Sequence, residues 1–339
     1  MVIWWLMSVV FGASLFLTWG LRRYALTRSL LDIPNHRSSH SFPTPRGGGV
    51  AIVLSFLAAA PFLSFFADLS WSFIWTLWGA GGLIAVVGFL DDHGHIAARW
   101  RLVAHFSAAI WAMFWMRGLP ALQLLGVDFD LSWVGHLLAV FYLVWMLNLY
   151  NFMDGIDGIA SVQAVTTCLG ACLIYWLAGD TSLIWSPLLL VMAVLGFLYW
   201  NFPPARIFMG DAGSGFLGLV LGILSIQAAW VSPRFLWVWV ILLGVFIVDA
   251  TFTLMRRLLR GDKVYEAHRS HAYQFASRQF GRHLPVTLAV MVINIFWLLP
   301  IAIWVGLFDL DGTIGTVLAY APLVFLAARF NAGKLEKTA

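Results

Sequence analysis

The sequence predicts an all-α integral membrane protein that forms a single domain of about eleven transmembrane helices. Of its 339 residues, 61% are hydrophobic and only 11% are charged, and the mean hydropathy is +0.87. Soluble domains keep roughly a quarter of their residues charged, so this composition excludes one. The apolar residues also form runs of about 20, the length at which a helix crosses a bilayer.

Polar segments separate these runs, and each run is expected to be one span. The first has no basic residue before it and no convincing cleavage site, so it is read as a retained helix and not as a signal peptide. The predicted spans cover residues 2–20, 49–67, 72–90, 101–117, 131–150, 159–178, 182–200, 213–231, 235–255, 286–306 and 313–329.

Basic residues predict the orientation of the domain. Of the 20 Lys and Arg residues, only Arg117 and Arg234 fall on one side of the predicted spans. The positive-inside rule makes the other side cytoplasmic, with the N-terminus outside and the C-terminus in the cytoplasm, which requires an odd number of spans. Topology therefore explains the formal net charge of +4, and no nucleic-acid partner is expected.

Polar side chains follow the same division. The loops predicted outside carry no recognisable chemistry, whereas those predicted inside hold carboxylates, histidines and glycines. We expect residues 1–339 to form one polytopic domain whose active site is built from the cytoplasmic loops 21–48, 91–100, 148–158, 201–212 and 256–285.

The segment NLYNFMDGIDG, residues 148–158, follows the fifth predicted span. Asn148, Asn151, Asp154 and Asp157 are spaced by three, so on a continued helix they would form one polar stripe. Capping a helix end needs one such residue and not four, so the pattern favours a functional site over a cap.

Asp91 and Asp92 end the third predicted span. Adjacent carboxylates repel each other, and a hard divalent cation such as Mg²⁺ would stabilise them while bridging substrate phosphates. Taken alone, the pair is explained equally well by a solvated loop. His93 and His95 could suggest Zn²⁺ or Mn²⁺, but a His-x-His in a loop is weak evidence.

The segment IFMGDAGSGF, residues 207–216, leads into the eighth predicted span. Gly210, Gly213 and Gly215 predict accessible backbone N–H groups at a helix N-terminus, where a phosphate binds favourably. Asp211 would add a carboxylate there. The segment is not a P-loop, because no Lys-Ser or Lys-Thr follows the glycines.

Two basic segments are open to more than one interpretation. In residues 256–274, attraction to lipid headgroups explains most Arg residues but not His268 and His271, because histidine is a poor anchor at neutral pH. In residues 32–49, Arg46 precedes three glycines and either holds an anionic group or serves topology alone.

Asp249 falls inside the ninth predicted span. Acids within the membrane are rare and usually face the protein interior, so Asp249 either supports the site or forms a structural pair.

Taken in order, five segments resemble the polyprenyl-phosphate N-acetylhexosamine-1-phosphate transferases, of the glycosyltransferase family 4 type. The resemblance covers nearly the whole chain, and five segments in the same order are far more specific than one. They are DIPNHRSSHSFPTPRGGG, FLDDHGHIAARWRL, NLYNFMDGIDGIA, FPPARIFMGDAGSGFLG and DATFTLMRRLLRGDKVYEAHRSHAYQ.

The resemblance implies transfer of a sugar-1-phosphate from a UDP-N-acetyl sugar to undecaprenyl phosphate, with release of UMP. It implies an enzyme of the bacterial inner membrane, surrounded by membrane lipid, whose active site faces the cytoplasm. Mg²⁺, or Mn²⁺ in its place, would be the cofactor, and a homodimer is an arrangement left open.

The resemblance also implies roles for individual residues. The catalytic residues would be Asp91, Asp92, Asp154, Asp157, His268 and His271, and one of the Asp91–Asp92 pair would deprotonate the lipid phosphate. Asp211 and Asp92 would hold the metal. The substrate-binding residues would be Asn148, Asn151, Arg46, Gly210, Gly213 and Ser214.

Two departures from the family pattern bear on the donor sugar. The histidine motif is often His-x-His-His, but here Arg269 and Ser270 separate His268 from His271. The peptidoglycan translocase carries lysines after its Asp-Asp pair, and this chain has none there. Both favour an O-antigen or surface-polysaccharide enzyme that uses a GlcNAc, FucNAc or QuiNAc donor over the phospho-N-acetylmuramoyl-pentapeptide transferase.

Two other classes of protein are weighed against a transferase. A secondary transporter would suit the number of spans, but its polar residues would lie near the midplane on broken helices in paired repeats. A non-catalytic scaffold for polysaccharide assembly would tolerate loss of Asp92 or Asp211.

Overall fold

A computed structural model describes residues 2–34, 42–94, 96–262 and 269–335. Its helices are α1 (Val2–Thr27), α2 (Val50–Ala59), α3 (Phe62–Phe66), α4 (Trp71–Thr76), α5 (Gly82–His93), α6 (Ala98–Met116), α7 (Ser132–Met153), α8 (Ile159–Ala178), α9 (Trp185–Asn201), α10 (Asp211–Val231), α11 (Pro233–Leu242), α12 (Gly244–Leu259), α13 (Ala272–Phe280), α14 (Leu284–Ile293), α15 (Leu299–Leu307) and α16 (Gly312–Arg329). Two short π-helical segments, η1 (Leu77–Gly81) and η3 (Asn294–Leu298), and one 3₁₀-helical segment, η2 (Thr181–Ile184), connect or extend them.

The helices account for all the predicted spans but do not settle their number. By length and composition, eight helices of the described chain could each cross a membrane, and a ninth if α11 and α12, bent by 71°, form one span. The segment Val50–Phe66 is shorter. The helix α6 begins with Arg99 and Arg101 in its first turn, which lower its apolar character. The protein is thus an α-helical, multi-pass membrane protein.

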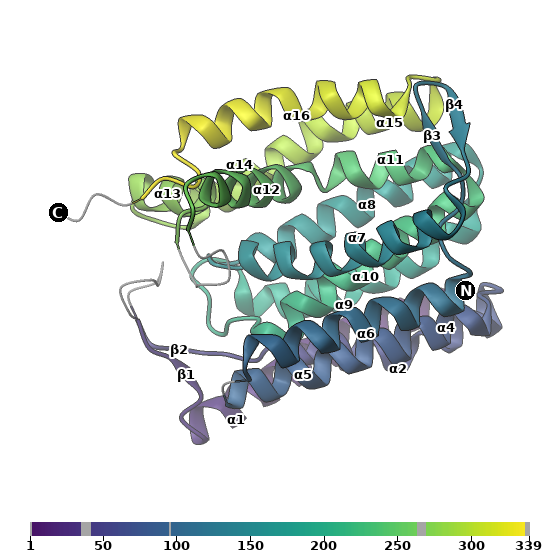
Figure 1. Cartoon of the computed structure of the whole chain (residues 1–339). Helices are drawn as coiled ribbons and strands as arrows, with labels where there is room; N and C mark the ends of the chain where they lie inside the picture. Colours follow the sequence, from purple (N-terminus) through teal and green to yellow (C-terminus); the bar gives the residue numbers. More distant parts are fainter. Residues whose placement is uncertain (1, 35–41, 95, 263–268, 336–339) are drawn as a thin grey trace.

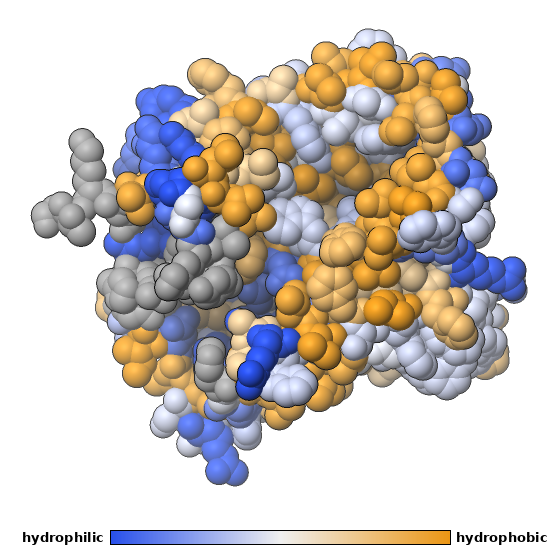
Figure 2. All heavy atoms as spheres, viewed as in Figure 1, coloured by the Kyte–Doolittle hydropathy of each residue, from blue (hydrophilic) through white to orange (hydrophobic). Residues whose placement is uncertain are grey.

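Most of the long helices lie roughly alongside one another (Figure 1). The helix α10 is the most buried span and packs against α5, α7 and α11, while α1 packs along α9. Figure 2 shows apolar side chains over much of the middle of the molecule, whereas hydrophilic residues gather at its two ends. The central position of α10 brings its first residues between α5 and α7.

Two small antiparallel ladders depart from an all-α chain. One pairs β1 (Leu31–Asp32) with β2 (Thr44–Pro45) at the end where α16 finishes, and the other pairs β3 (Leu122–Leu124) with β4 (Val127–Phe129) at the opposite end (Figure 1). The first helix also continues to Thr27, beyond the predicted end at residue 20, so part of the predicted loop 21–48 is helical.

Buried polar side chains stabilise the break between α11 and α12. The break leaves the Leu242 carbonyl available, and it accepts hydrogen bonds from Gln163 Nε2 at 2.9 Å and Thr167 Oγ1 at 3.1 Å. Asn294 Nδ2 donates to Gln163 Oε1 at 3.0 Å. A backbone group freed in the apolar interior needs such partners, so these side chains hold the bend that sets the direction of α12.

Asp311 caps α16 at the end that carries β3 and β4. Its carboxylate accepts hydrogen bonds from the backbone N–H groups of Thr313, Ile314 and Gly126, at 2.9, 3.1 and 2.9 Å. Burial alone would raise the pKa of Asp311, but these N–H groups outweigh it, and the pKa lies below the usual value of 3.8.

We expect Asp311→Ala to lower the stability of the fold by about 1 kcal/mol, as for other lost N-caps. Because the folded-state pKa is depressed, the charge-dependent part of this stabilisation is complete above about pH 4 and is lost as the pH falls through the folded pKa. Melting temperatures of both proteins in detergent at pH 7 and pH 3 test this. An equal difference at both pH values would contradict the role of the ionised carboxylate.

Candidate active site

Asp92 connects the end of α5 to the beginning of α10. The residue is buried, and its Oδ1 and Oδ2 atoms accept hydrogen bonds from the backbone N–H groups of Asp211 at 3.1 Å and Ala212 at 3.4 Å. A carboxylate is favoured at this point by the helix dipole. The N–H groups of Gly213 and Ser214 donate to the Gly210 carbonyl.

This arrangement corrects one prediction. The glycines of residues 207–216 do not leave a set of open N–H groups for phosphate, because Asp92 takes the position that an external anion would occupy. Gly210 instead provides space: its φ is +77°, and a Cβ atom there would lie 2.5 Å from Asp92 Oδ2. A Cβ on Gly213 would lie 2.6 Å from the Gly49 Cα, so Gly213 permits close packing on α2.

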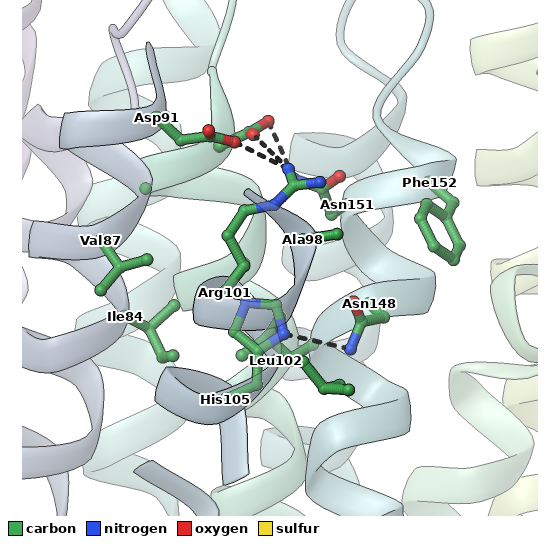
Figure 3. Close-up of a pocket in the computed structure, with 14 residues that line it drawn as sticks. Ile84, Val87, Asp91, Ala98, Arg101, Leu102, His105, Asn148, Asn151 and Phe152 are labelled. Carbon is green, nitrogen blue, oxygen red and sulfur yellow. Dashed lines mark hydrogen bonds and ion pairs between the residues drawn. The ribbon is translucent and has the colours of Figure 1, made fainter. Parts of the chain in front are cut away.

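Arg101 links two further carboxylates. Its Nη1 atom lies 2.7 Å from Asp91 Oδ2 and 3.7 Å from Asp211 Oδ2 (Figure 3). Asp91 Oδ1 also accepts the N–H of Ile96 at 2.7 Å. In the sequence, Arg101 is only one of the charges that predict topology, whereas its position on the first turn of α6 makes it part of the site.

The amides of α7 contact the same group of side chains. Asn151 Nδ2 donates to Asp211 Oδ1 and Ser214 Oγ, both at 3.0 Å. One turn earlier, Asn148 Nδ2 lies 3.3 Å from His105 Nδ1 of α6 (Figure 3). His105 is not among the predicted site residues, although it lies four residues after Arg101 and therefore on the same face of the helix.

These side chains surround a cavity of about 220 Å³ between α5, α6, α7 and α10. Its polar wall carries Asp91, Arg101, His105, Asn148, Asn151 and Asp211, and its apolar wall includes Ile84, Val87, Leu102, Leu147 and Phe152. The cavity could thus bind a ligand that carries a charged group next to an apolar one.

The predicted polar stripe along residues 148–157 is wrong, because α7 ends at Met153. Asp154 caps the end of the helix, and Gly158 has a φ of +72° that turns the chain. Burial, and then the negative charges of Asp211, Asp92 and Asp157, raise the pKa of Asp154 well above its usual range. The neighbouring carboxylates of the site thus contribute to the raised pKa of Asp154.

Asp157 faces a second cavity, of about 440 Å³. Its Oδ1 lies 3.0 Å from His283 Nδ1, and its Oδ2 accepts the N–H of Ala205 at 3.0 Å. The lining also includes Phe42, Thr44, Pro203, Pro204, Phe208, Gly281, Arg282 and Leu284. His283 is not among the predicted site residues, because only folding brings it near Asp157.

Arg46, from the loop before α2, contacts Asp92, whereas His271, at the start of α13, lies apart from the first cavity. The Arg46 guanidinium donates to the backbone oxygen of Asp92, and the neighbouring Gly48 and Gly49 N–H groups donate to Phe208 and Met209 carbonyls. His271 is buried beside Asp249 and does not line the first cavity. His268 lies outside the described residues.

Comparisons with known proteins identify the family of the chain. The model of glycosyl transferase family 4 matches residues 74–229. The chain is 32% identical, over 85% of its length and 82% of the relative, to a probable undecaprenyl-phosphate N-acetylglucosaminyl 1-phosphate transferase of Bacillus subtilis (strain 168). It is 27% identical to an undecaprenyl-phosphate alpha-N-acetylglucosaminyl 1-phosphate transferase of Thermotoga maritima, over 85% of the chain and 87% of the relative.

A phospho-N-acetylmuramoyl-pentapeptide-transferase of Bacillus licheniformis is 28% identical over 70% of the chain and 75% of the relative. None of these similarities bears on a homodimer. Asp91, Asp92 and Asp211 all lie within the residues that the family model matches. The similarity to the B. subtilis relative extends along most of the chain. The protein therefore belongs to glycosyl transferase family 4, among the polyprenyl-phosphate N-acetylhexosamine-1-phosphate transferases.

Proposed function

We propose that the protein transfers N-acetylhexosamine-1-phosphate from a UDP-N-acetyl sugar to undecaprenyl phosphate and releases UMP. The reaction would begin synthesis of a lipid-linked O-antigen or another surface polysaccharide at the cytoplasmic face of the bacterial inner membrane. The observation that carries the proposal is the meeting of Asp91, Asp211 and Arg101 with Asn151 in one cavity that also has apolar walls.

A divalent cation fits the donor atoms of this site. Asp91 and Asp211 present carboxylate oxygens to the same guanidinium nitrogen, so both lie where positive charge is required. Among the described residues, no three His, Cys, Asp or Glu side chains are grouped to hold a metal alone. Mg²⁺ usually binds one or two carboxylates and takes its other ligands from water and substrate phosphates, so the set is sufficient.

We assign Asp211 as a ligand of this cation, which would neutralise the diphosphate charge during transfer. Asp92 as a second ligand stays a prediction: both its oxygens accept N–H bonds, and each retains a further lone pair. Its observed contacts show a second task, since they hold the backbone of Asp211 in place. Asn151 orients the Asp211 carboxylate.

The acceptor fits the same cavity. Arg101 and His105 could bind its phosphate, and Leu102, Leu147 and Phe152 could contact the first part of the lipid. Asp91, beside Arg101, is then the candidate that accepts a proton from this phosphate. The donor would reach the site from the second cavity, where Phe42, Phe208 and Asp157 can contact a nucleotide base.

The relatives' names and the departures in the motifs support a GlcNAc-type donor. Identity and coverage are higher for the N-acetylglucosaminyl 1-phosphate transferase of B. subtilis than for the pentapeptide transferase of B. licheniformis. The pentapeptide donor remains the alternative substrate.

The direct test is UMP release by the purified protein in detergent, with a short polyprenyl phosphate, Mg²⁺ and a panel of UDP-N-acetyl sugars. We expect UMP only when lipid and sugar are both present, with UDP-GlcNAc or a 6-deoxy HexNAc donor most active. The highest rate with the muramoyl-pentapeptide donor would reassign the substrate, and UMP from no donor would overturn the function.

Removal of the metal is expected to stop this reaction. With EDTA in excess, UMP release should fall at least about a hundred-fold, because the diphosphate charge is no longer neutralised. Adding back Mg²⁺ or Mn²⁺ should restore the rate. Undiminished turnover in EDTA, with metal content checked by mass spectrometry, would exclude a metal-dependent transfer.

A further inference from the structure

We propose that Asp249 is a positioning residue that fixes the turn after α7 through α13, a role that rests on the proposed transfer reaction. Asp249 is 6% exposed and lies on α12, five residues after the helix begins at Gly244. It lines neither the 220 Å³ nor the 440 Å³ cavity. It lines instead a third cavity, of about 120 Å³, together with Ala272 and Tyr273. We therefore expect its influence on the reaction to pass through other residues.

The Asp249 carboxylate holds the first turn of α13. Its Oδ1 accepts the N–H of Ala272 at 2.9 Å, and its Oδ2 accepts the N–H of Tyr273 at 3.0 Å. These are N–H groups that a helix cannot satisfy internally, and a negative charge is favoured there by the dipole. The helix α13 is thus docked on α12 by its N-terminus.

Tyr273 connects the first turn of α13 to the turn after α7. Its side chain is 4% exposed, and its hydroxyl donates to the Phe152 carbonyl at 3.0 Å. A Cβ atom on Gly155 would lie 2.2 Å from the same hydroxyl, so the tyrosine rests directly on the turn. Phe152 follows Asn151, which orients Asp211, and Asp154 comes two residues later.

His271 belongs to the same connection. Its Nδ1 atom lies 3.4 Å from Asp249 Oδ1, and its ring stacks at 5.8 Å on Tyr273 and at 6.5 Å on Phe152. One buried carboxylate therefore sets the place of two side chains that touch the end of α7. The His271 motif and the Asn151–Asp154 motif are joined at this point.

A carboxylate with only a structural role would predict a different result. Its loss would reduce the amount of folded protein and leave the turnover of the folded fraction unchanged. A positioning role predicts folded protein with a lower kcat and little change in the KM for the donor, since the donor cavity at Asp157 does not contain Asp249.

The test compares Asp249→Asn, Tyr273→Phe and the double variant. The amide introduced by Asp249→Asn would keep one acceptor atom but direct an NH₂ group at the second N–H of α13. We expect kcat for UMP release to fall about ten- to a hundred-fold in Asp249→Asn, as for small misplacements of catalytic groups. Because Asp249 acts through Tyr273, the double variant should be no slower than Asp249→Asn.

Thr253→Val is the matched control. Thr253 Oγ1 donates to Asp249 Oδ1 at 3.2 Å, so the variant removes a bond to the same carboxylate without touching α13. Its kcat should stay near that of the wild type. The proposal is overturned if the double variant loses kcat by the product of the two single losses, or if Tyr273→Phe keeps the wild-type kcat. The Tyr273→Phe result tests the proposal even if Asp249→Asn does not fold.

Hydrogen exchange provides a readout that needs no substrate. In Asp249→Asn, the amides of Ala272 and Tyr273 should exchange faster, and those in the middle of α10 should not change. If the wild type releases no UMP, the proposed function fails while this exchange still tests the docking. Unchanged exchange at Ala272 and Tyr273 would refute the docking whatever the reaction is.

Discussion

Asp211→Asn should reduce UMP release at least about a hundred-fold, the largest effect expected of any single substitution here. The variant is nearly isosteric, and its side-chain oxygen can still accept the bond from Asn151 Nδ2 that Asp211 Oδ1 accepts at 3.0 Å. The fold should therefore be retained. What is lost is the negative charge that faces Arg101 and that we assign to the cation.

Rates should be measured over a range of Mg²⁺ concentrations, because a lost ligand also raises the concentration needed for half-maximal rate. Asp262→Asn is the control: Asp262 is paired with Arg260 beyond the end of α12 and lines neither cavity. Asp262→Asn should keep the wild-type rate and Mg²⁺ dependence. An Asp211→Asn rate within about ten-fold of the wild type would remove Asp211 from the metal site.

Gly88→Ala should abolish most activity although residue 88 bears no functional group. A Cβ atom there would lie 2.5 Å from both N and Cα of Ala212. These are backbone atoms, so the first turn of α10 must move away from α5. Asp92 then loses its bonds to α10, and Asp211 moves relative to Arg101; a shift of about 1 Å can cost about a hundred-fold in rate.

Gly82→Ala provides a matched control in the same helix. A Cβ atom at residue 82 meets nothing within 4 Å, and its φ of −62° suits any residue. Alanine is favoured over glycine in a helix, so this variant should be at least as stable as the wild type. Melting temperature and UMP release should fall for Gly88→Ala alone, and equal behaviour of the two variants would contradict the close packing of α5 on α10.

Several parts of the site could be predicted from local sequence patterns. Hydropathy identified the apolar segments, because the length and composition of a span follow from the bilayer itself. The segments around Asp91, Asn151 and Asp211 stand out in the sequence by an adjacent pair of carboxylates, a regular polar spacing and a run of glycines before an apolar segment. The structure brings these three residues into one cavity.

Other parts could not be predicted, because they depend on which atoms packing brings together. Asp92 accepts N–H bonds from residues 119 and 120 positions away, and nothing in the local sequence identifies that partner. The polar stripe failed for a related reason. The spacing of Asp154 and Asp157 suits a helix, but α7 ends at Met153, and Asp157 turns to a different cavity.

Local sequence patterns were thus enough for the class of protein, its apolar segments and four of the polar residues that line the first cavity, Asp91, Asn148, Asn151 and Asp211. These properties depend on the composition of short segments, which hydropathy and spacing describe directly. The partners of the acidic residues follow from folding alone: Arg101 for Asp91 and Asp211, His283 for Asp157, and the N-terminus of α13 for Asp249. Those contacts depend on how distant helices bend and pack, as at the break between α11 and α12, and no local pattern records that geometry.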